Sequence, residues 1–262
     1  MDSSTAKPES SPGKGTLMGG FEQYHPPSDS QWAEAYRTGL IALDTNALLD
    51  LYKFSPTARE QYLDVLTQVK DQLFVPHQVA LEFHRNRIGT VKKHLAELDK
   101  NHEEVRRLAK QLEDSINRIG KRNLQTDQLR AAQSSIQSIE SLSKSVIDSY
   151  APIPRDMGHG IDEVLARLIE LLDGHVGNQP TPETLAADQE EGRRRFAEKI
   201  APGFADTDKD HGINGDYLLW AEIKRACAAN PRPVLLVTND VTKGDWIFES
   251  GGIAVGAHVN LI

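Results

Sequence analysis

The sequence has little of what marks secreted or membrane proteins. Its 262 residues include one cysteine, Cys227, which excludes an internal disulfide and suits a reducing compartment. No apolar run approaches the roughly 20 residues that cross a bilayer, and the start, rich in Ser, Pro and Gly, lacks the apolar core of a signal peptide. We therefore expect a cytoplasmic protein without a membrane partner.

The charge balance argues against one class of nucleic-acid binder. Lys and Arg number 30 and Asp and Glu 38, for a formal net charge of −8, whereas proteins that coat nucleic acids are basic. A nuclease stays compatible with this charge, because enzymes that cut phosphodiesters gather carboxylates around metal ions. Other catalytic signatures are missing from the sequence, namely HExxH, paired Cys, a Walker A run, GxGxxG after a strand and GxSxG.

Two short apolar runs end close to a carboxylate. Leu40–Leu43 leads directly into Asp44, and Val234–Val237 is soon followed by Asp240. Such runs indicate buried strands, and open α/β sheets bind ligands at the carboxyl ends of their strands. If the two strands are parallel neighbours, the two carboxylates repel each other unless a divalent cation lies between them. The alternative is that each Asp caps the helix that follows.

Two further acids lie at predicted element ends. A predicted strand over 72–76 precedes a helix whose first turns carry Glu82. The alternative to a functional role for Glu82 is a surface pair with Arg85 or Asn86. Asp216 opens an amphipathic helix that leads into the second apolar strand, and the helix dipole favours an acid there whatever its function.

The longest pattern in the chain is a heptad seam. Apolar residues, with His102 among them, recur at alternating spacings of four and three over 91–119, and a weaker stripe returns over 129–146. The sequence therefore predicts an antiparallel coiled-coil hairpin, with His102 as a polar position that sets its register. The seam is able to pack within the hairpin or to pair with a second chain, so a homodimer and another protein partner both stay open.

The domain organisation follows from these patterns. We expect a disordered tail over 1–20, an α/β domain built from 21–90 and 196–262, and a helical insertion over 91–195 whose hairpin covers 91–150.

Local signals mark two helix starts. A Ser or Thr followed by Pro favours a helix N-terminus, and this pair occurs at Ser55-Pro56 and at Thr181-Pro182. The second helix carries the triple basic run Arg193–Arg195, which indicates either a solvated helix face or contact with phosphates at the mouth of a site. Near the end of the chain, Gly251-Gly252 precedes an apolar stretch that we expect to form a last strand or turn.

The acids at the element ends suit a metal site. Carboxylate oxygens are the ligands that Mg²⁺ and Mn²⁺ prefer, and these ions keep several waters. Two such ions about 4 Å apart activate a water and stabilise the leaving oxygen of a phosphodiester. A phosphatase is less favoured, because its Asp-x-Asp pair is absent and position 46 is Asn.

Five short runs carry a resemblance to a known family. They are Leu-Asp-Thr-Asn at 43–46, Glu-Phe-x-Arg-Asn at 82–86, Pro-Gly-Phe-x-Asp at 202–206, Gly-Asp-x-x-x-Trp at 215–220, and Thr-Asn-Asp at 238–240 with Asp-Trp behind it. The first run resembles the opening motif of PIN domains, metal-dependent ribonucleases related in fold to flap endonucleases. The set resembles the bacterial PIN-like proteins with a long helical insertion. Two departures are Asn239, where that family often has Asp, and an end that comes soon after Gly256.

The resemblance implies a three-layer α/β/α fold with a parallel sheet of four or five strands. It also implies an endonuclease that cleaves single-stranded RNA with Mg²⁺ or Mn²⁺, in some relatives within toxin or phage-defence systems. The metal-binding and catalytic acids would be Asp44, Glu82, Asp216 and Asp240. The supporting groups would be Asn46, Asp206, Lys209, Thr238 and Asp245, and the phosphate contacts would be Arg85, Arg87 and Lys209. The alternative is a catalytically silent PIN-like scaffold that acts through its hairpin.

Overall fold

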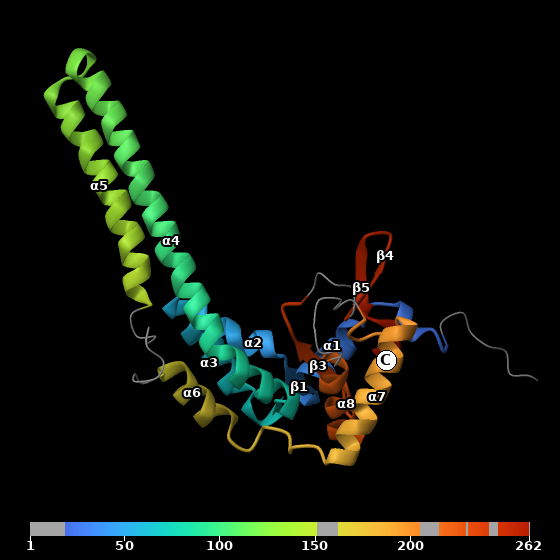
Figure 1. Cartoon of the computed structure of the whole chain (residues 1–262). Coiled ribbons are helices and arrows are strands. Elements are labelled where there is room, and N and C mark those ends of the chain that lie inside the picture. The colour runs from blue at the N-terminus through green and yellow to red at the C-terminus, as the bar shows by residue number, and fades with distance from the viewer. Residues whose placement is uncertain (1–18, 151–161, 205–214, 229, 241–245, 262) are drawn as a thin grey trace, which may run out of the picture.

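The computed structural model describes residues 19–150, 162–204, 215–228, 230–240 and 246–261. A mixed α/β body carries a long helical hairpin that rises from it (Figure 1). The elements in chain order are η1 Glu22–Tyr24, α1 Asp29–Thr38, β1 Leu40–Leu43, α2 Thr45–Leu49, η2 Asp50–Tyr52, α3 Pro56–Gln68, η3 Lys70–Gln72, β2 Leu73–Phe74, α4 His77–Asn123, α5 Thr126–Ser149, α6 Glu163–Leu172, α7 Pro182–Glu198, α8 Gly215–Ala228, β3 Val234–Val237, β4 Ile247–Ser250, β5 Ile253–Ala257 and η4 Val259–Leu261. None of the described helices is long and apolar enough to cross a membrane.

The body is organised around β1. This strand pairs in parallel with β2 on one side and with β3 on the other. All four residues of β1 are buried, although successive side chains of a strand point to opposite faces of the sheet. Both faces of the sheet are therefore covered, as expected for a three-layer α/β/α fold with a buried parallel sheet.

The parallel sheet is smaller than the four or five strands that the resemblance predicted. Among the described residues it has three strands in the order β2-β1-β3, and β4 and β5 form a separate antiparallel hairpin. Gly251 and Gly252 connect β4 to β5, and both have positive φ, a conformation that glycine adopts without a Cβ clash. This tight turn makes antiparallel partners of the last two strands, and they form a sheet of their own. The expected last strand is present as β5.

Both predicted helix starts are confirmed. Ser55 accepts a hydrogen bond from the backbone N–H of Ala58 at the start of α3, with Pro in the first turn. Thr181 accepts one from Thr184 in the same way at the start of α7. The hydroxyl oxygen of each cap satisfies a backbone donor that the helix cannot satisfy itself.

The hairpin is continuous with the body. Helix α4 runs unbroken through 47 residues, about 70 Å at 1.5 Å per residue. It carries Glu82 in the body, and its outer part packs along α5 (Figure 1). Part of the seam packs within the hairpin, because Ala109 and Ile136 are buried and His102 Nδ1 lies 3.0 Å from Ser143 Oγ. Leu112 and Ile119 of the same predicted seam are about half exposed. The boundary predicted at 90/91 falls inside this helix.

The hydrophobic core gathers side chains from β1, β2, α2, α3, α4, α6 and α8. Leu43, Leu51, Tyr52 and Ile223 are wholly shielded from solvent there. This packing fixes the sheet edge at the end of β1, from which α2 leaves. The predicted tail lies outside the described residues except for Gly19 and Gly20, and the division of the chain into domains stays a prediction.

Candidate active site

Asp44 lies at the carboxyl end of β1 and is the N-cap of α2. It is only 9% exposed. Its Oδ1 accepts the backbone N–H of Thr45 at 2.6 Å, and its Oδ2 accepts Asn46 Nδ2 at 2.6 Å and Thr238 Oγ1 at 2.7 Å. Burial raises the pKa of Asp44 above its ordinary value, the bonds from Thr238 and Thr45 oppose this, and the charge of Glu82 raises the pKa further. Asp44 therefore caps its helix and also faces a second acid.

Asn46 and Thr238 join the turn after β3 to the end of β1. Asn46 Nδ2 lies 3.1 Å from Thr238 Oγ1, and Asn46 Oδ1 accepts the backbone N–H of Asn239 at 3.0 Å. Thr238 Oγ1 also accepts the backbone N–H of Asp240 at 3.0 Å. These bonds hold the backbone of Asp240 near the Asp44 carboxylate, although 194 positions separate Thr238 from Asp44.

Glu82 reaches the same edge from α4. Thr45 Oγ1 donates to Glu82 Oε2 at 3.1 Å, and Gln78 Nε2 donates to Glu82 Oε1 at 2.7 Å. Because the backbone N–H of Thr45 bonds to Asp44, this one threonine connects the two carboxylates. The structure thus gives Glu82 two partners inside the site in place of a surface ion pair.

Helix α8 begins against Glu82. A Cβ atom at Gly215 would lie 2.7 Å from Glu82 Oε1, which is closer than carbon and oxygen atoms approach without a shift of one of them. Because Gly215 has no side chain, the start of α8 can lie close to Glu82. Asp216 is the next residue, in the first turn of α8, where the helix dipole favours a negative charge.

The donor set at this edge suits a hard divalent cation. Among the described residues, no group of three His, Cys, Asp or Glu side chains lies close enough to hold a metal ion. Asp44 accepts three hydrogen bonds and Glu82 accepts two, out of about four that a carboxylate can accept. The oxygen ligands and the repulsion between the two acids fit Mg²⁺ or Mn²⁺. The assignment of four ligands stays a prediction.

A comparison with protein families decides the family. Residues 40–261 match the model of a family described as a PIN-like domain. The chain belongs to the PIN-like domain family. These domains are part of a nuclease superfamily whose members bind nucleic acid, and PIN domains typically use divalent metal ions. Searches of curated proteins and of solved structures found no significant match.

Some predicted groups of the PIN-like site fall outside the structure's scope. Asp206, Lys209 and Asp245 lie outside the described residues, so their roles stay predictions. Arg85 is exposed on α4, about one helical turn beyond Glu82. Residues at this spacing share one face of a helix, so Arg85 lies on the face of Glu82, and its contact with phosphate stays a prediction.

Arg87, the other arginine predicted to contact phosphate, is paired with an acid and largely buried. Its guanidinium forms an ion pair with Asp162, and its side chain is 13% exposed. Asp162 also accepts the Tyr52 hydroxyl at 2.8 Å and the backbone N–H of Leu165 at 2.9 Å. Arg87 therefore fastens the start of α6 to α4, and this pairing disfavours the predicted contact with phosphate.

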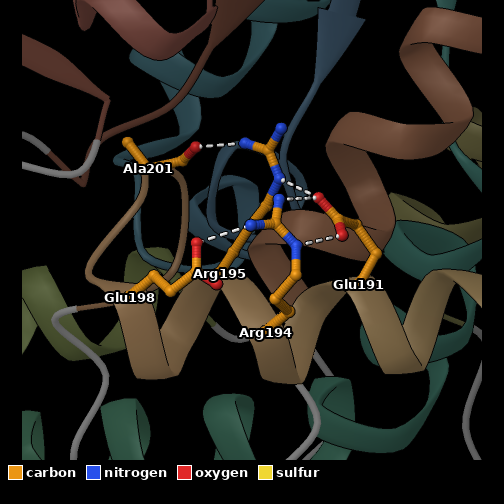
Figure 2. A network of polar contacts seen from close by, with 5 residues as sticks. All are labelled: Glu191, Arg194, Arg195, Glu198 and Ala201. Atoms are coloured by element: carbon orange, nitrogen blue, oxygen red, sulfur yellow. Dashed lines mark hydrogen bonds and ion pairs between the residues drawn. The ribbon is translucent and has the colours of Figure 1, made fainter.

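The triple arginine run of α7 is paired with acids of its own helix. Figure 2 shows Arg194 between Glu191 and Glu198, and Arg195 between Glu191 and the carbonyl oxygen of Ala201. The first arginine of the run pairs with the acid three residues before it. Bonds from Arg194 and Arg195 lower the pKa of Glu191 to about 2. An ion-paired helix face fits these contacts better than a phosphate-binding cluster.

The sequence did not reveal Glu222, which positions α4. Glu222 is 8% exposed, and its carboxylate accepts the backbone N–H groups of His77 at 2.5 Å and Gln78 at 3.1 Å. Helix α4 has Pro76 at its N-cap and no side-chain cap of its own there, so Glu222 supplies that function from α8. Burial raises the pKa of Glu222. The sequence signal that could have revealed Glu222 was a carboxylate on the inner face of α8.

The sequence also missed Thr45 and Gln78. Gln78 precedes Glu82 by four residues on one helix, a spacing that places the two side chains side by side, so this contact had a local signal. The bond from Thr45 to Glu82 crosses from α2 to α4, and only the packing of these helices reveals it.

Proposed function

We propose that this PIN-like protein is an endonuclease that uses Mg²⁺ or Mn²⁺ to cleave single-stranded RNA. The observation that supports this most is the carboxylate pair of Asp44 and Glu82. Two acids from different elements are connected by Thr45, and both can accept further ligands. Their mutual repulsion is reduced when a divalent cation lies between them.

In this proposal, each acid at the sheet edge has a separate role. Asp44 and Asp216 hold the main cation, and Asp240 completes the ligand set. Glu82 orients a water molecule or holds a second cation, and Arg85 meets the phosphate backbone. A bound cation would lower the pKa of the attacking water, and it would stabilise the negative charge that develops on the phosphodiester.

Asn46 and Thr238 position the carboxylate of Asp44. Both donate to its Oδ2, so they fix the direction in which Oδ1 faces. Groups that orient a metal-binding side chain commonly change metal affinity 10- to 100-fold. Asp206, Asp245 and Lys209 keep the supporting and phosphate-binding roles that the resemblance implies.

RNA is proposed as the substrate because of the resemblance, and DNA is the alternative. RNA cleavage would suit a toxin or phage-defence setting. The test is cleavage of labelled single-stranded RNA and DNA with Mn²⁺, with EDTA, and with the Asp44→Asn variant. We expect the variant to lose activity at least about a hundredfold, since a metal ion supplies several kcal/mol to such reactions.

Asp64→Asn is the matched control, because Asp64 is exposed on α3 and makes the same change in charge. It should cleave like the wild type. Full activity in a folded Asp44→Asn protein would end the assignment of the site. Cleavage of DNA alone would keep the site and change the substrate.

The second candidate function is a catalytically silent scaffold that acts through the hairpin. It is favoured by the apolar side chains that the hairpin exposes, such as Leu112 and Leu142. Mn²⁺ titration of the wild type separates the two functions. A folded protein without Mn²⁺ affinity and without cleavage of either substrate would favour the scaffold. Mn²⁺ binding without cleavage would keep the metal site and reject the two substrates tested.

A further inference from the structure

The outer part of the hairpin has apolar side chains that its own two helices do not cover. The exposed fractions are 49%, 49% and 55% for Leu108, Leu112 and Ile119 on α4, and 53%, 67% and 45% for Ile139, Leu142 and Val146 on α5. We call these six residues the hairpin stripe. Figure 1 shows this part of the hairpin standing clear of the α/β body.

The stripe lies on one side of the hairpin. On α4, Leu112 follows the buried Ala109 by three residues, and on α5, Ile139 follows the buried Ile136 by three residues. The two helices are antiparallel and both Ala109 and Ile136 lie buried between them, so an equal offset from these two residues points to the same side of the hairpin. The offset recurs one heptad later at Ile119 and Val146. Both helices therefore contribute to one continuous face.

The heptad positions of this face are uncharged along the hairpin. One heptad before and after Leu108 are Asn101 and Ser115, and the residues one heptad from Leu142 are both serines. The arginines at 106 and 107 pair with glutamates three residues earlier on the same helix. The face thus offers no row of cations to a nucleic acid and no charged pattern to an oppositely charged protein.

The size of the face approaches what each partner of a stable dimer buries. Six aliphatic side chains at about half exposure present on the order of 600 Å² of apolar surface, at the upper end for the largest patch of a typical monomer. With the uncharged residues between them, the face approaches the roughly 800 Å² that each partner buries in a standard interface. Covering it would remove this surface from water, which is the main driving force of association.

We propose that the hairpin stripe is the interface of a homodimer, in which two hairpins pack face to face as a four-helix bundle. A second copy brings the same heptad period and the same uncharged surface, as an isologous interface requires. Interfaces between identical chains are the more apolar class, and helices with a seven-residue apolar repeat pack into such bundles. The dimer does not depend on the nuclease proposal.

The test is the molar mass of the full chain by sedimentation equilibrium over a range of concentrations. The wild type should behave as a dimer with a measurable dissociation constant. Leu142→Glu places a charge in the stripe and should raise that constant at least about tenfold. Ser141→Glu adds the same charge one residue away, where the helix turns it from the stripe, and should leave the constant unchanged.

Leu112→Glu on α4 is a second variant from the other helix, and it should weaken the dimer as well. Far-UV circular dichroism checks that each variant is folded, and Leu142 is 67% exposed, so its replacement leaves the core intact. A monomeric wild type would overturn the proposal. So would a dimer that survives both stripe variants, or one that Ser141→Glu weakens equally.

Discussion

The sheet edge and the hairpin use charged residues in opposite ways. At the edge, Asp44 is buried and its partner Thr238 is 194 positions away. On the hairpin, Glu104 and Arg107 are three residues apart, and their side chains are 52% and 53% exposed. Burial raises the pKa of Asp44, whereas the bond from Arg107 lowers the pKa of Glu104. At the sheet edge, the fold keeps the Asp44 carboxylate buried although burial disfavours its charged form. On the hairpin, water and Arg107 both stabilise the charged form of Glu104.

Substitutions should therefore have unequal effects in the two regions. When a buried acceptor is removed, its donors stay unpaired because water cannot reach them, so the loss of stability is large. An exposed pair exchanges its partner for water and is screened by salt, so the cost is small. Substitutions near the edge should therefore change stability or metal binding, and matched ones on the hairpin should not.

The largest effect is expected at Glu222, which holds the start of α4. Glu222→Ala removes the acceptor of two backbone N–H groups, and it should lower the free energy of unfolding by about 2–3 kcal/mol. Urea denaturation measures this. Glu170→Ala, at an exposed position on α6, is the control and should stay within about 0.5 kcal/mol of the wild type. Equal values for the two variants would contradict the capping role of Glu222.

The wild type and the Glu222→Ala variant also test the pKa of Glu222. Burial raises its pKa in the folded state above the ordinary value, so folding takes up protons between the unfolded and folded pKa values. Its contribution to stability is therefore greatest below the unfolded pKa and declines as the pH rises through the folded pKa. The stability difference between wild type and Glu222→Ala should be larger at about pH 4 than at about pH 7.

A smaller effect is expected at Thr238, and it depends on the proposed metal site. Thr238→Val removes the hydroxyl bond to Asp44 while keeping the side-chain volume, and it should weaken Mn²⁺ binding about tenfold. Thr238→Ser keeps the hydroxyl and should bind Mn²⁺ like the wild type. Isothermal titration measures both, and equal affinities for Val and Ser would show that the hydroxyl does not position Asp44.

The smallest effect is expected on the hairpin at Glu104. Glu104→Gln breaks an exposed pair with Arg107 and should leave Tm unchanged within error at low and at high salt. Thermal melts followed by circular dichroism measure this. A clear loss of Tm at low salt would show that local pairs on the hairpin contribute as the buried contacts do.

The sequence predicted those parts of the molecule that depend on local patterns. The apolar run before Asp44, the Ser-Pro start at Ser55 and the seam through His102 each report a local environment, and the structure has the strand, the helix and the packed hairpin there. The Gly251-Gly252 turn was visible too, yet the pairing of β4 with β5 depends on partners that a turn alone does not name.

Contacts between distant elements were beyond the sequence. Arg87 is close to Glu82 in the chain and was expected to meet phosphates, but α6 brings Asp162 to it and buries the pair. The bond from Thr45 to Glu82 exists only because α2 packs on α4. Asp206 and Asp245 stay predictions, since they lie outside the described residues.

The length of α4 has a mechanical consequence. Val79, Phe83, Val91 and Leu95 embed the first part of the helix in the core, and Glu222 grips its first residues. Glu82 lies inside this clamped part, about 20 Å along the helix from Leu95. The outer part projects beyond the core as a beam that is fixed at one end. We therefore expect a load on the tip of the hairpin to bend α4 beyond Leu95 and to leave the Glu82 carboxylate at the sheet edge in place.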